Sequence, residues 1–530
     1  MSKPLSYQTL TNFGVNGLNT QNNPATLDPS YLTSADNVVL RESGRISFRK
    51  GLKQKVVPSG VAIGSMTEHN DQGTNKIFAS HGTSIYTVDF TAPNAAFPSS
   101  GADVKHTVGS TTADWQFVNF NNRLHCFHTG VIPQRYDGSL GSGVKWTAHA
   151  TDPASIATLF DPSCGMGFYG RIWCGGVTEA KDVVYYSNLL DGDDWTGGDT
   201  GLLDLSKIWD NDEVVALAPF YGKLVIFGKN NIAIYNSPET VGSLAIDEII
   251  RGVGCVSRDS VQAIGDDLVF LSATGLRSLA RTTEKDKLPL TDLTVNIKDT
   301  IIRNIGQSTN VKSVYVENEG IYIMTFTDKN ITYIFDFKHI TPQGTPRITT
   351  WSFEADREPS AMLYTELYSG LLVGQKDGGI AGYEGYFDTD LAWVSSAASY
   401  TNSAFTADIS SIWIRVGDLA ASILKKMILV LEGGSGASLG LRWYKDFSMN
   451  SSSTTQIALA PATTGTTALW GASTSLWGDV KYTPIYGLEE YKTALTGSAK
   501  HLKLNMSIVS NGYDVSVQDL AIISKQGKIR

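Results

Sequence analysis

The chain is short of charge, of long apolar runs and of export signals. Charged residues make up 18% of its 530 residues and the formal net charge is −9, against roughly 25% charged residues in average domains. A general nucleic-acid binder is disfavoured because it usually carries a basic footprint. The longest apolar run, 427–431, is far too short to span a bilayer, and residues 1–20 lack the apolar core of a signal peptide. We therefore expect a soluble protein that is not exported.

Cysteine pairing is also missing. The four cysteines contain no CxxC pair and no dense framework, which predicts four buried free thiols in a protein made in a reducing cytoplasm. They are Cys126, Cys164, Cys174 and Cys255. Glycine, by contrast, is abundant at 51 residues, as expected where many tight turns join short strands.

A strand–turn–strand pattern is repeated along the middle of the chain. Its first strands begin at Ile77, Leu124, Ile172, Leu224, Leu268, Ile321 and Leu371, so successive copies are 47, 48, 52, 44, 53 and 50 residues apart. A period of roughly 40–50 residues built from strands is the signature of a β-propeller with one four-stranded blade per repeat. The sequence predicts a mainly β protein with a propeller of six or seven blades over 61–390.

One segment inside the repeats has helical rather than strand periodicity. Leu293, Ile297, Ile301 and Ile305 recur every fourth residue, which places them on one face of a helix. With Thr291 as N-cap and Gly306 as stop, the pattern predicts an inserted amphipathic helix of about four turns near 291–305.

The two ends of the chain differ from the repeats. Residues 1–60 show little periodicity and are interpreted as an extended N-terminal arm. Residues 391–530 contain Ser/Thr-rich stretches and alternating strands such as 501–509, which favour a C-terminal antiparallel β-sandwich or platform.

Several short motifs invite a chemical interpretation, and each has a simpler one. In 125–128, His-Cys-Phe-His, strand alternation places His125 and Phe127 on one face and Cys126 and His128 on the other, so metal ligands do not converge. The acidic segments 191–195 and 210–213 lack a complete calcium loop, and exposed turn carboxylates are the expected reading, with a weak structural cation as the alternative. Residues 436–440 match G-x-S-x-G, but a strand follows where the nucleophile elbow needs a helix. We therefore predict no enzymatic activity and assign no catalytic, cofactor-binding or metal-binding residue.

Three blocks of the chain, taken in order, resemble one family. They are the arm (16–20, 34–38, 44–46, 49–51), the middle (217–227, 252–261, 267–276) and a strand-rich C-terminus closing on 526–530. This order is similar to the tail nozzle proteins of short-tailed bacteriophages, also called tail tubular protein B or packaged-DNA stabilisation protein. The resemblance lies in turns and apolar strands over most of the chain rather than in one diagnostic motif.

The resemblance implies a structural virion protein without enzymatic activity or cofactor. In that family a six-fold ring below the portal and adaptor retains packaged DNA and later releases it through a central channel, without sequence-specific binding. Adjoining adaptor or portal-side proteins, and a fibre or needle, would be its partners. The virion tail, assembled in the host cytoplasm, would be its location.

Charge and the arm offer two checks on this expectation. Six copies would carry about −54 (6 × −9), and an acidic wall would not grip the phosphates of DNA in transit. An arm with few core residues would become ordered by adding strands to a neighbour. Deleting residues 1–50 is then expected to leave the propeller folded and to weaken ring assembly or docking.

Two other functions remain open from the sequence. A receptor- or glycan-binding propeller of a virion is suggested by 11 Trp and 22 Tyr residues. A propeller glycosidase or lyase comes last, because it needs clustered inward carboxylates that no pattern marks.

Overall fold

The computed structural model describes most of the chain, and this part divides into two compact units. The described residues are 5–10, 12–41, 45–88, 90, 114–140, 145–280, 292–306, 310–368, 370–384, 390–394, 399–417, 420–433, 437–451, 453–459, 488–509 and 515–527. The propeller unit is Gln54–Thr332 with Glu354–Gly382, and the sandwich unit is Met1–Lys53, Tyr333–Phe353 and Tyr383–Arg530. Each unit is described below on its own.

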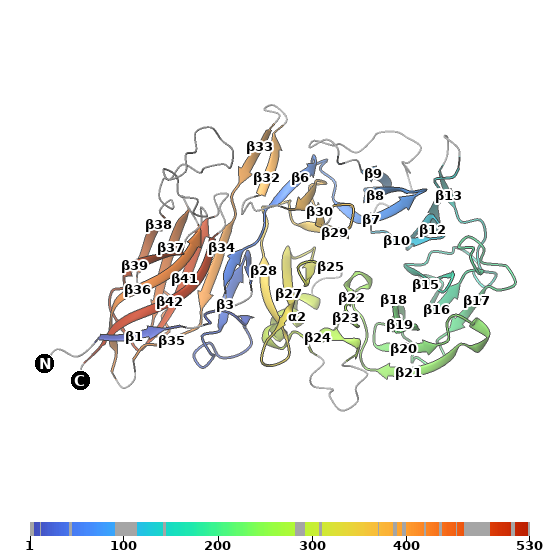
Figure 1. Cartoon of the computed structure of the whole chain (residues 1–530). Coiled ribbons are helices and arrows are strands. Elements are labelled where there is room, and N and C mark those ends of the chain that lie inside the picture. Colours follow the sequence, from blue (N-terminus) through green and yellow to red (C-terminus); the bar gives the residue numbers. More distant parts are fainter. Residues whose placement is uncertain are drawn as a thin grey trace, which may run out of the picture. The chain divides into compact units, whose positions relative to one another are not determined.

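The first five predicted hairpins of the repeat each lie in a separate antiparallel sheet of the propeller unit, and the strands of the last two copies belong to larger sheets (Figure 1). In chain order the sheets contain β7 (Ile63–Asp71), β8 (Thr74–His81) and β9 (Ser84–Val88); β10 (Gln116–Phe120), β11 (Arg123–His128), β12 (Val131–Tyr136) and β13 (Trp146–Ala148); β14 (Cys164–Phe168), β15 (Arg171–Val177), β16 (Ala180–Tyr186) and β17 (Gly201–Asp204); β18 (Val214–Phe220), β19 (Lys223–Gly228), β20 (Asn231–Asn236) and β21 (Ala245–Arg251); β22 (Gln262–Ile264), β23 (Asp267–Ser272) and β24 (Gly275–Ser278); β25 (Val311–Val316) and β26 (Ile321–Phe326); β29 (Pro359–Thr365), β30 (Gly370–Gln375) and β31 (Ile380–Tyr383).

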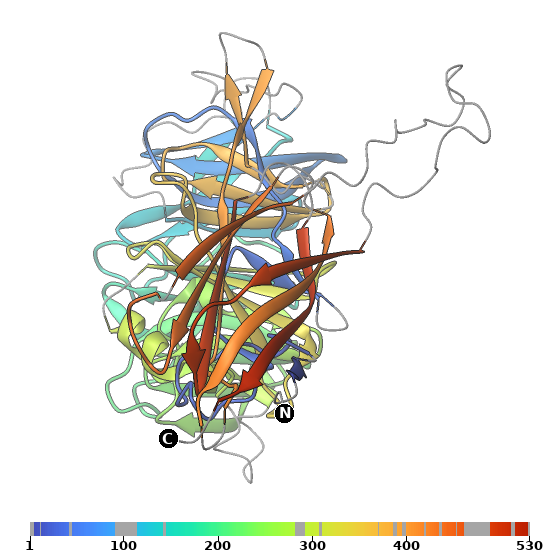
Figure 2. The same cartoon turned by 90° about the vertical axis from the view of Figure 1, so that its left-hand side faces the viewer.

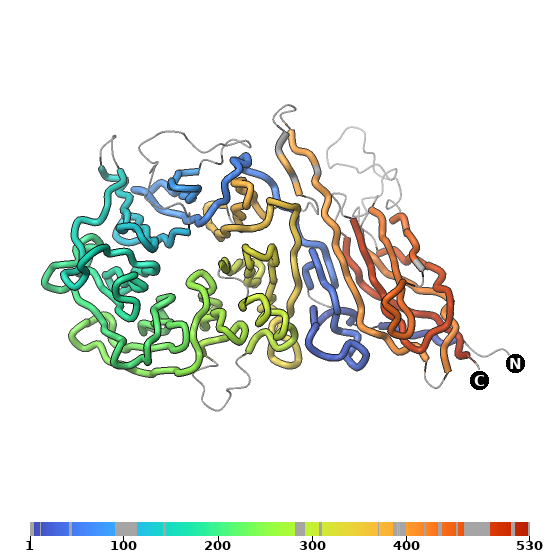
Figure 3. The backbone as a smooth tube through the Cα atoms, turned by 180° about the vertical axis from the view of Figure 1, so that it is seen from behind, coloured from blue at the N-terminus to red at the C-terminus, as the bar shows by residue number. Residues whose placement is uncertain are grey.

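The sheets follow one another around a ring (Figure 3). Their first strands contact in succession: β7 meets β10, β10 meets β14 and β14 meets β18. The 3-10 helix η3 (Arg258–Ser260) contacts β18 and β25, β25 contacts β29, and β29 returns to β7. The first strands therefore lie innermost and close the ring, as in a β-propeller.

Buried side chains fill the space between successive sheets. Phe127 of β11 packs with Ile172 and Cys174 of β15, and Trp173 of β15 packs with Leu224 of β19. The alternating faces of β15 thus serve two different cores, which is how the period-2 pattern of a strand lets each sheet bury both faces. The predicted fold class, mainly β with a propeller, is confirmed.

The predicted helix is present but shorter than expected. A 3-10 turn, η5 (Val295–Ile297), leads into α2 (Lys298–Ile305), which has eight residues, and Gly306 is its C-cap as predicted. Leu293, Ile297 and Ile301 are buried, so the apolar face was identified correctly. Thr291, predicted as the N-cap, lies outside the described residues. The estimate of about four turns was wrong because the first apolar residue, Leu293, precedes the helix in a turn that follows the bridge at Asp292.

Two sheets form the sandwich unit, which faces the viewer in Figure 2. The first contains β39 (Leu488–Ala494), β36 (Ser422–Gly433), β42 (Val515–Gln526), β5 (Ile46–Phe48) and β4 (Val38–Leu40), with β1 (Leu5–Thr9) on β42 and β40 (Ser498–Ala499) on β36. The second contains β28 (Pro346–Trp351), β2 (Gly17–Leu18), β3 (Tyr31–Asp36), β34 (Thr406–Ser411), β41 (His501–Val509), β37 (Ser438–Lys445) and β38 (Ser453–Ala458), with β35 (Ile414–Arg415) on β41. Four further strands complete the described strands of the chain: β27 (Ile331–Ile340), β6 (Leu52–Val56), and the hairpin of β32 (Asp390–Val394) with β33 (Ser399–Ser403).

One core lies between these two sheets, and the N-terminal segment belongs to it. Leu32, Val38, Ile46 and Phe48 are at most 3% exposed and pack with apolar residues of β36, β37, β41 and β42. The interpretation of this segment as an arm with few core residues is therefore wrong. Its strands are only two to six residues long, too short for a visible period, and their partners lie hundreds of residues away.

Arg49 joins the three sequence segments that make up the sandwich unit. Its buried guanidinium forms a two-pronged ion pair with Asp390 (Nη1–Oδ1 3.0 Å, Nη2–Oδ2 3.1 Å), and its Nε donates to Asn37. The same group lies over the rings of Phe405, 3.8 Å from the centroid, and Phe353. The unit boundaries consequently differ from the predicted ones at 60 and 390. Within the described part of the chain, no helix is long and apolar enough to cross a membrane.

Candidate functional site

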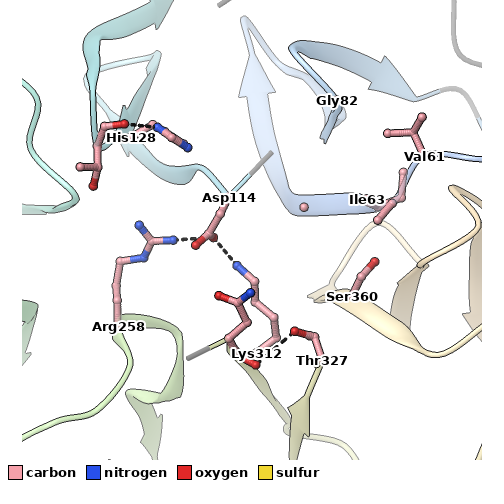
Figure 4. A pocket seen from close by; sticks show the side chains of 13 residues that line it. Val61, Ile63, Gly82, Asp114, His128, Arg258, Lys312, Thr327 and Ser360 are labelled. Carbon is pink, nitrogen blue, oxygen red and sulfur yellow. Dashed lines mark hydrogen bonds and ion pairs between the residues drawn. The ribbon is translucent and has the colours of Figure 1, made fainter. Parts of the chain in front are cut away.

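A cavity of ≈490 Å³ opens at one end of the ring of inner strands (Figure 4). Its lining comes from the strands and adjoining turns of four sheets and from η3, and includes Ile63 at the start of β7, Thr129 after β11 and Ser360 of β29. A second cavity of ≈520 Å³ adjoins it and shares Asp114, Thr129 and Arg258. A cavity of this size is in the range of small-molecule sites, so we take it as the candidate site.

Two cations and two carboxylates meet in this cavity. Arg258 of η3 pairs with Asp114, which precedes β10, at 2.8 Å (Nη2–Oδ1), and with its neighbour Asp259 at 2.9 Å (Nε–Oδ1). Lys312 of β25 contacts Asp114 and pairs with Asp259 at 2.6 Å (Nζ–Oδ2). The guanidinium also donates from Nη1 to the carbonyl oxygen of Ser163 at 2.5 Å. The cluster thus connects η3 with segments of three sheets by charge-assisted hydrogen bonds.

Mutual pairing keeps Arg258, Lys312 and Asp259 ionised in spite of their burial. Burial opposes the charge on Arg258 and on Lys312, but the carboxylates of Asp259 and Asp114 outweigh it and raise the pKa of both cations. Burial also works against ionised Asp259, yet Arg258 and Lys312 lower the pKa of this carboxyl well below its usual range. Two positive and two negative charges therefore balance at neutral pH.

Exposure distinguishes the two carboxylates. The side chains of Arg258 and Lys312 are 14% exposed and that of Asp259 is 26% exposed, whereas that of Asp114 is 50% exposed. A buried ion pair gains little net stability, but removing one partner is costly because the other charge is left uncompensated. The two fixed cations can hold an anion, and in this structure that anion is the carboxylate of Asp114.

A second polar cluster lies between two neighbouring sheets. His125 of β11, His149 after β13 and Asp193 in the β16–β17 connection are all buried. Nδ1 of His125 is 3.1 Å from Nε2 of His149, and Oδ1 of Asp193 is 4.0 Å and 3.8 Å from these two nitrogens. The three ligand-type atoms lie within 4.8 Å of one another.

The hydrogen bonds of His149 decide what this cluster can bind. Trp195 donates its indole N–H to Nδ1 of His149 at 3.0 Å. An indole nitrogen is a donor only, so Nδ1 carries no proton and the proton of the neutral ring is on Nε2. That Nε2–H donates to Nδ1 of His125 and offers no lone pair to a metal ion. The residues do not form a ready ligand set for a metal in this arrangement.

The protonation of both rings agrees with this assignment. Burial, reinforced by the positive charge of Arg135, lowers the pKa of His149 to about 3. Burial, followed by the nearby His149 and two arginines, lowers the pKa of His125 well below its ordinary value. Among the described residues, His125 Nε2 and Asp193 Oδ1 find no hydrogen-bond partner, whereas Asp193 Oδ2 accepts from Arg123 Nη1 at 3.0 Å and from Arg135.

The structure confirms one sequence prediction for these residues and contradicts another. The expected division of the motif 125–128 is found, because Phe127 packs with the core around Trp195 while Cys126 packs with the opposite core. The prediction that the acidic segments carry exposed turn carboxylates is wrong for Asp193 and Asp212, which are only 5% and 7% exposed. Asp212 accepts the backbone N–H groups of Lys229 and Asn230, which compensates its burial.

The other predicted features are placed as follows. All four cysteines are free and buried, as predicted, and burial raises the pKa of Cys164 to about 12 and that of Cys255 to about 11. Ser438 begins strand β37, so a strand does follow the G-x-S-x-G motif, while Gly436 lies outside the described residues. His149, Asp114 and Arg258 were not singled out from the sequence, because no spacing links residues that only the closed ring brings together.

Comparison with known proteins adds no relative. A scan against models of protein families finds no match for this chain, and a search of the curated proteins finds no significant similarity.

Proposed function

We propose that this chain is a structural protein of a short-tailed phage virion that forms the tail nozzle ring. Six copies would surround a channel, retain the packaged DNA and give it a path for ejection, beside adaptor or portal-side proteins and a possible fibre or needle. The proposal rests on the order of the three resembling blocks, and the propeller fold is compatible with it.

The structural observation that supports assembly is an apolar surface at an edge of the sandwich unit. Leu5 and Tyr7 of β1 are 65% and 61% exposed, and Ile423 of β36 is 41% exposed. Leu5 and Ile423 both pair with Lys525 of β42, and directly opposed residues share one face of a sheet. Among the described strands β1 pairs only with β42, so its other edge is open. An open edge beside exposed apolar side chains is suited to a contact with another copy.

The first experiment asks whether the full chain forms a ring. The mass in solution and electron-microscopy class averages of the purified protein should show six copies around an axial channel. A monomer at all accessible concentrations would contradict the nozzle.

A pair of variants tests the proposed surface. Leu5→Lys combined with Tyr7→Lys introduces like charges beside Lys525 on this face, and we expect the ring to dissociate into folded monomers. Met449→Lys is the matched control, since Met449 is an exposed apolar residue (91%) of the same unit but not of this face. A ring that survives the double change, or that is lost equally in the control, would remove the role of β1.

The ≈490 Å³ cavity supports a glycan-binding propeller as a second candidate function. It is lined by hydroxyl and amide groups, including Thr129, Asn310 and Thr327, which suit a hydroxylated ligand. A monomer that binds carbohydrate would favour this function over the nozzle.

A further inference from the structure

The two cations of the ≈490 Å³ cavity, Arg258 and Lys312, have carboxylate partners of two kinds. Asp259 is the chain neighbour of Arg258 in η3 and contacts both Arg258 and Lys312. Asp114 comes from the segment that precedes β10, is half-exposed, and contacts the same two cations (Figure 4). Asp259 is therefore held in place by η3 itself, whereas Asp114 makes its contact across the cavity.

If Asp114 moved away, the positive charges of Arg258 and Lys312 would no longer be fully compensated. Arg258 and Lys312 would then share the single negative charge of Asp259, and the cluster would carry a net charge of +1 in a cavity of ≈490 Å³. Both side chains are only 14% exposed, so water would compensate that charge poorly. An anion entering from solvent would regain the pairing that Asp114 supplies.

We propose that Arg258 and Lys312 form an anion-binding site that Asp114 occupies as an internal ligand. The external ligand is a small hydroxylated carboxylic acid of the uronate class. Its carboxylate takes the place of the Asp114 carboxylate, and its hydroxyls meet the polar wall at Thr129, Thr327 and Ser360. This site is independent of whether the chain assembles into a ring.

Competition with Asp114 sets the expected affinity. A tethered carboxylate has a high effective concentration at the cations. If Asp114 occupies them for about nine-tenths of the time, the external acid binds about tenfold more weakly than to the vacant site. The unmodified protein is thus a weak binder, and removing the internal ligand strengthens binding.

The experiment measures binding of glucuronate to the full chain by calorimetry at low ionic strength, with glucose as the uncharged control. Asp114→Ala should bind glucuronate at least about tenfold more tightly than the unmodified protein, and neither should bind glucose comparably. Adding Lys312→Met to Asp114→Ala should abolish the gain. Asp210→Ala is the matched control, because Asp210 is an exposed ion-paired carboxylate of the same unit, bound to Arg251, and it should leave binding unchanged.

Folding is checked in parallel by the melting temperature and by protection of the four buried thiols. If Asp114→Ala does not fold, Asp114→Asn removes the same charge with nearly the same shape and must show the gain. The proposal is overturned if the folded variant gains no affinity for glucuronate, if glucose binds equally well, or if Lys312→Met leaves the gain intact.

Discussion

The propeller unit and the sandwich unit are both all-β in their cores, yet the chain builds them in opposite ways. In the propeller, paired strands are neighbours in sequence, as where Leu224 pairs with Tyr235. In the sandwich, β3 pairs with β34, so that Ala35 lies opposite Ile409. Local pairing closes short loops and is entropically cheaper than pairing of distant segments. The fold of the sandwich therefore depends on every one of its sequence segments, whereas the propeller is assembled from segments that are neighbours in sequence.

Deleting residues 1–50 should produce the largest difference in stability between the two units. The deletion removes Leu32, Val38, Ile46 and Phe48 from the sandwich core, so we expect that unit to lose its fold while the propeller persists. All four cysteines lie in the propeller unit and are buried, and their protection against a thiol reagent reports that unit alone. Limited proteolysis should then cut within the core strands β36, β37, β41 and β42 while the thiols stay protected. Full protease resistance of these four strands in the truncated chain would show that the N-terminal segment is dispensable for the sandwich.

Arg49→Ala should have the next largest effect, confined to the sandwich unit. It leaves Asp390 without its buried partner and removes the cation from the faces of Phe353 and Phe405. Loss of one partner of a buried pair costs about 3–5 kcal/mol, which denaturant unfolding followed by proteolysis can measure. Arg415→Ala, at an exposed arginine of the same unit, should change the free energy of unfolding by about 0.5 kcal/mol or less. Equal effects of the two changes would mean that Arg49 does not join the segments.

Mild acid should weaken the propeller through its histidine pair. The pKa of His149 is lowered to about 3, and burial lowers that of His125 as well, from ordinary values near 6.5. Between these limits the unfolded chain binds protons that the folded chain excludes. The stability is thus complete above about pH 6.5 and falls as the pH drops below it, by about 1.4 kcal/mol per pH unit for each histidine.

The variant His149→Gln tests this dependence. A Gln amide can accept a hydrogen bond from Trp195 and donate one to His125, and it does not titrate. The change of the propeller's unfolding free energy with pH between pH 6.5 and 4 should therefore be smaller by about 1.4 kcal/mol per pH unit, the contribution of one histidine. Thiol exposure as a function of denaturant measures that slope. An unchanged slope would show that His149 is not the group that acid protonates on unfolding.

Much of the propeller could be predicted, because each repeat carries its own pattern. The strands beginning at Lys223 and Asn231 are apolar, adjacent and joined by a short turn, so sequence alone indicates their pairing. The candidate site could not be predicted in the same way. Asp114 and Lys312 are 198 residues apart and show no common motif. The burial of Asp193 was not predicted, because a carboxylate in a glycine-containing turn is expected to be exposed. In the fold, Arg123 and Arg135 pair with this carboxylate.

The β class, the repeated hairpins, the apolar face of the helix and the buried thiols could be predicted, because they follow from the local periodicity and residue type of short segments. Three other features are visible only in the folded chain: the N-terminal segment completes the sandwich core, Arg258 and Lys312 share Asp114, and Trp195 sets the tautomer of His149. Those features depend on contacts between residues far apart in the chain, which form when sheets close or pack and which no local pattern encodes.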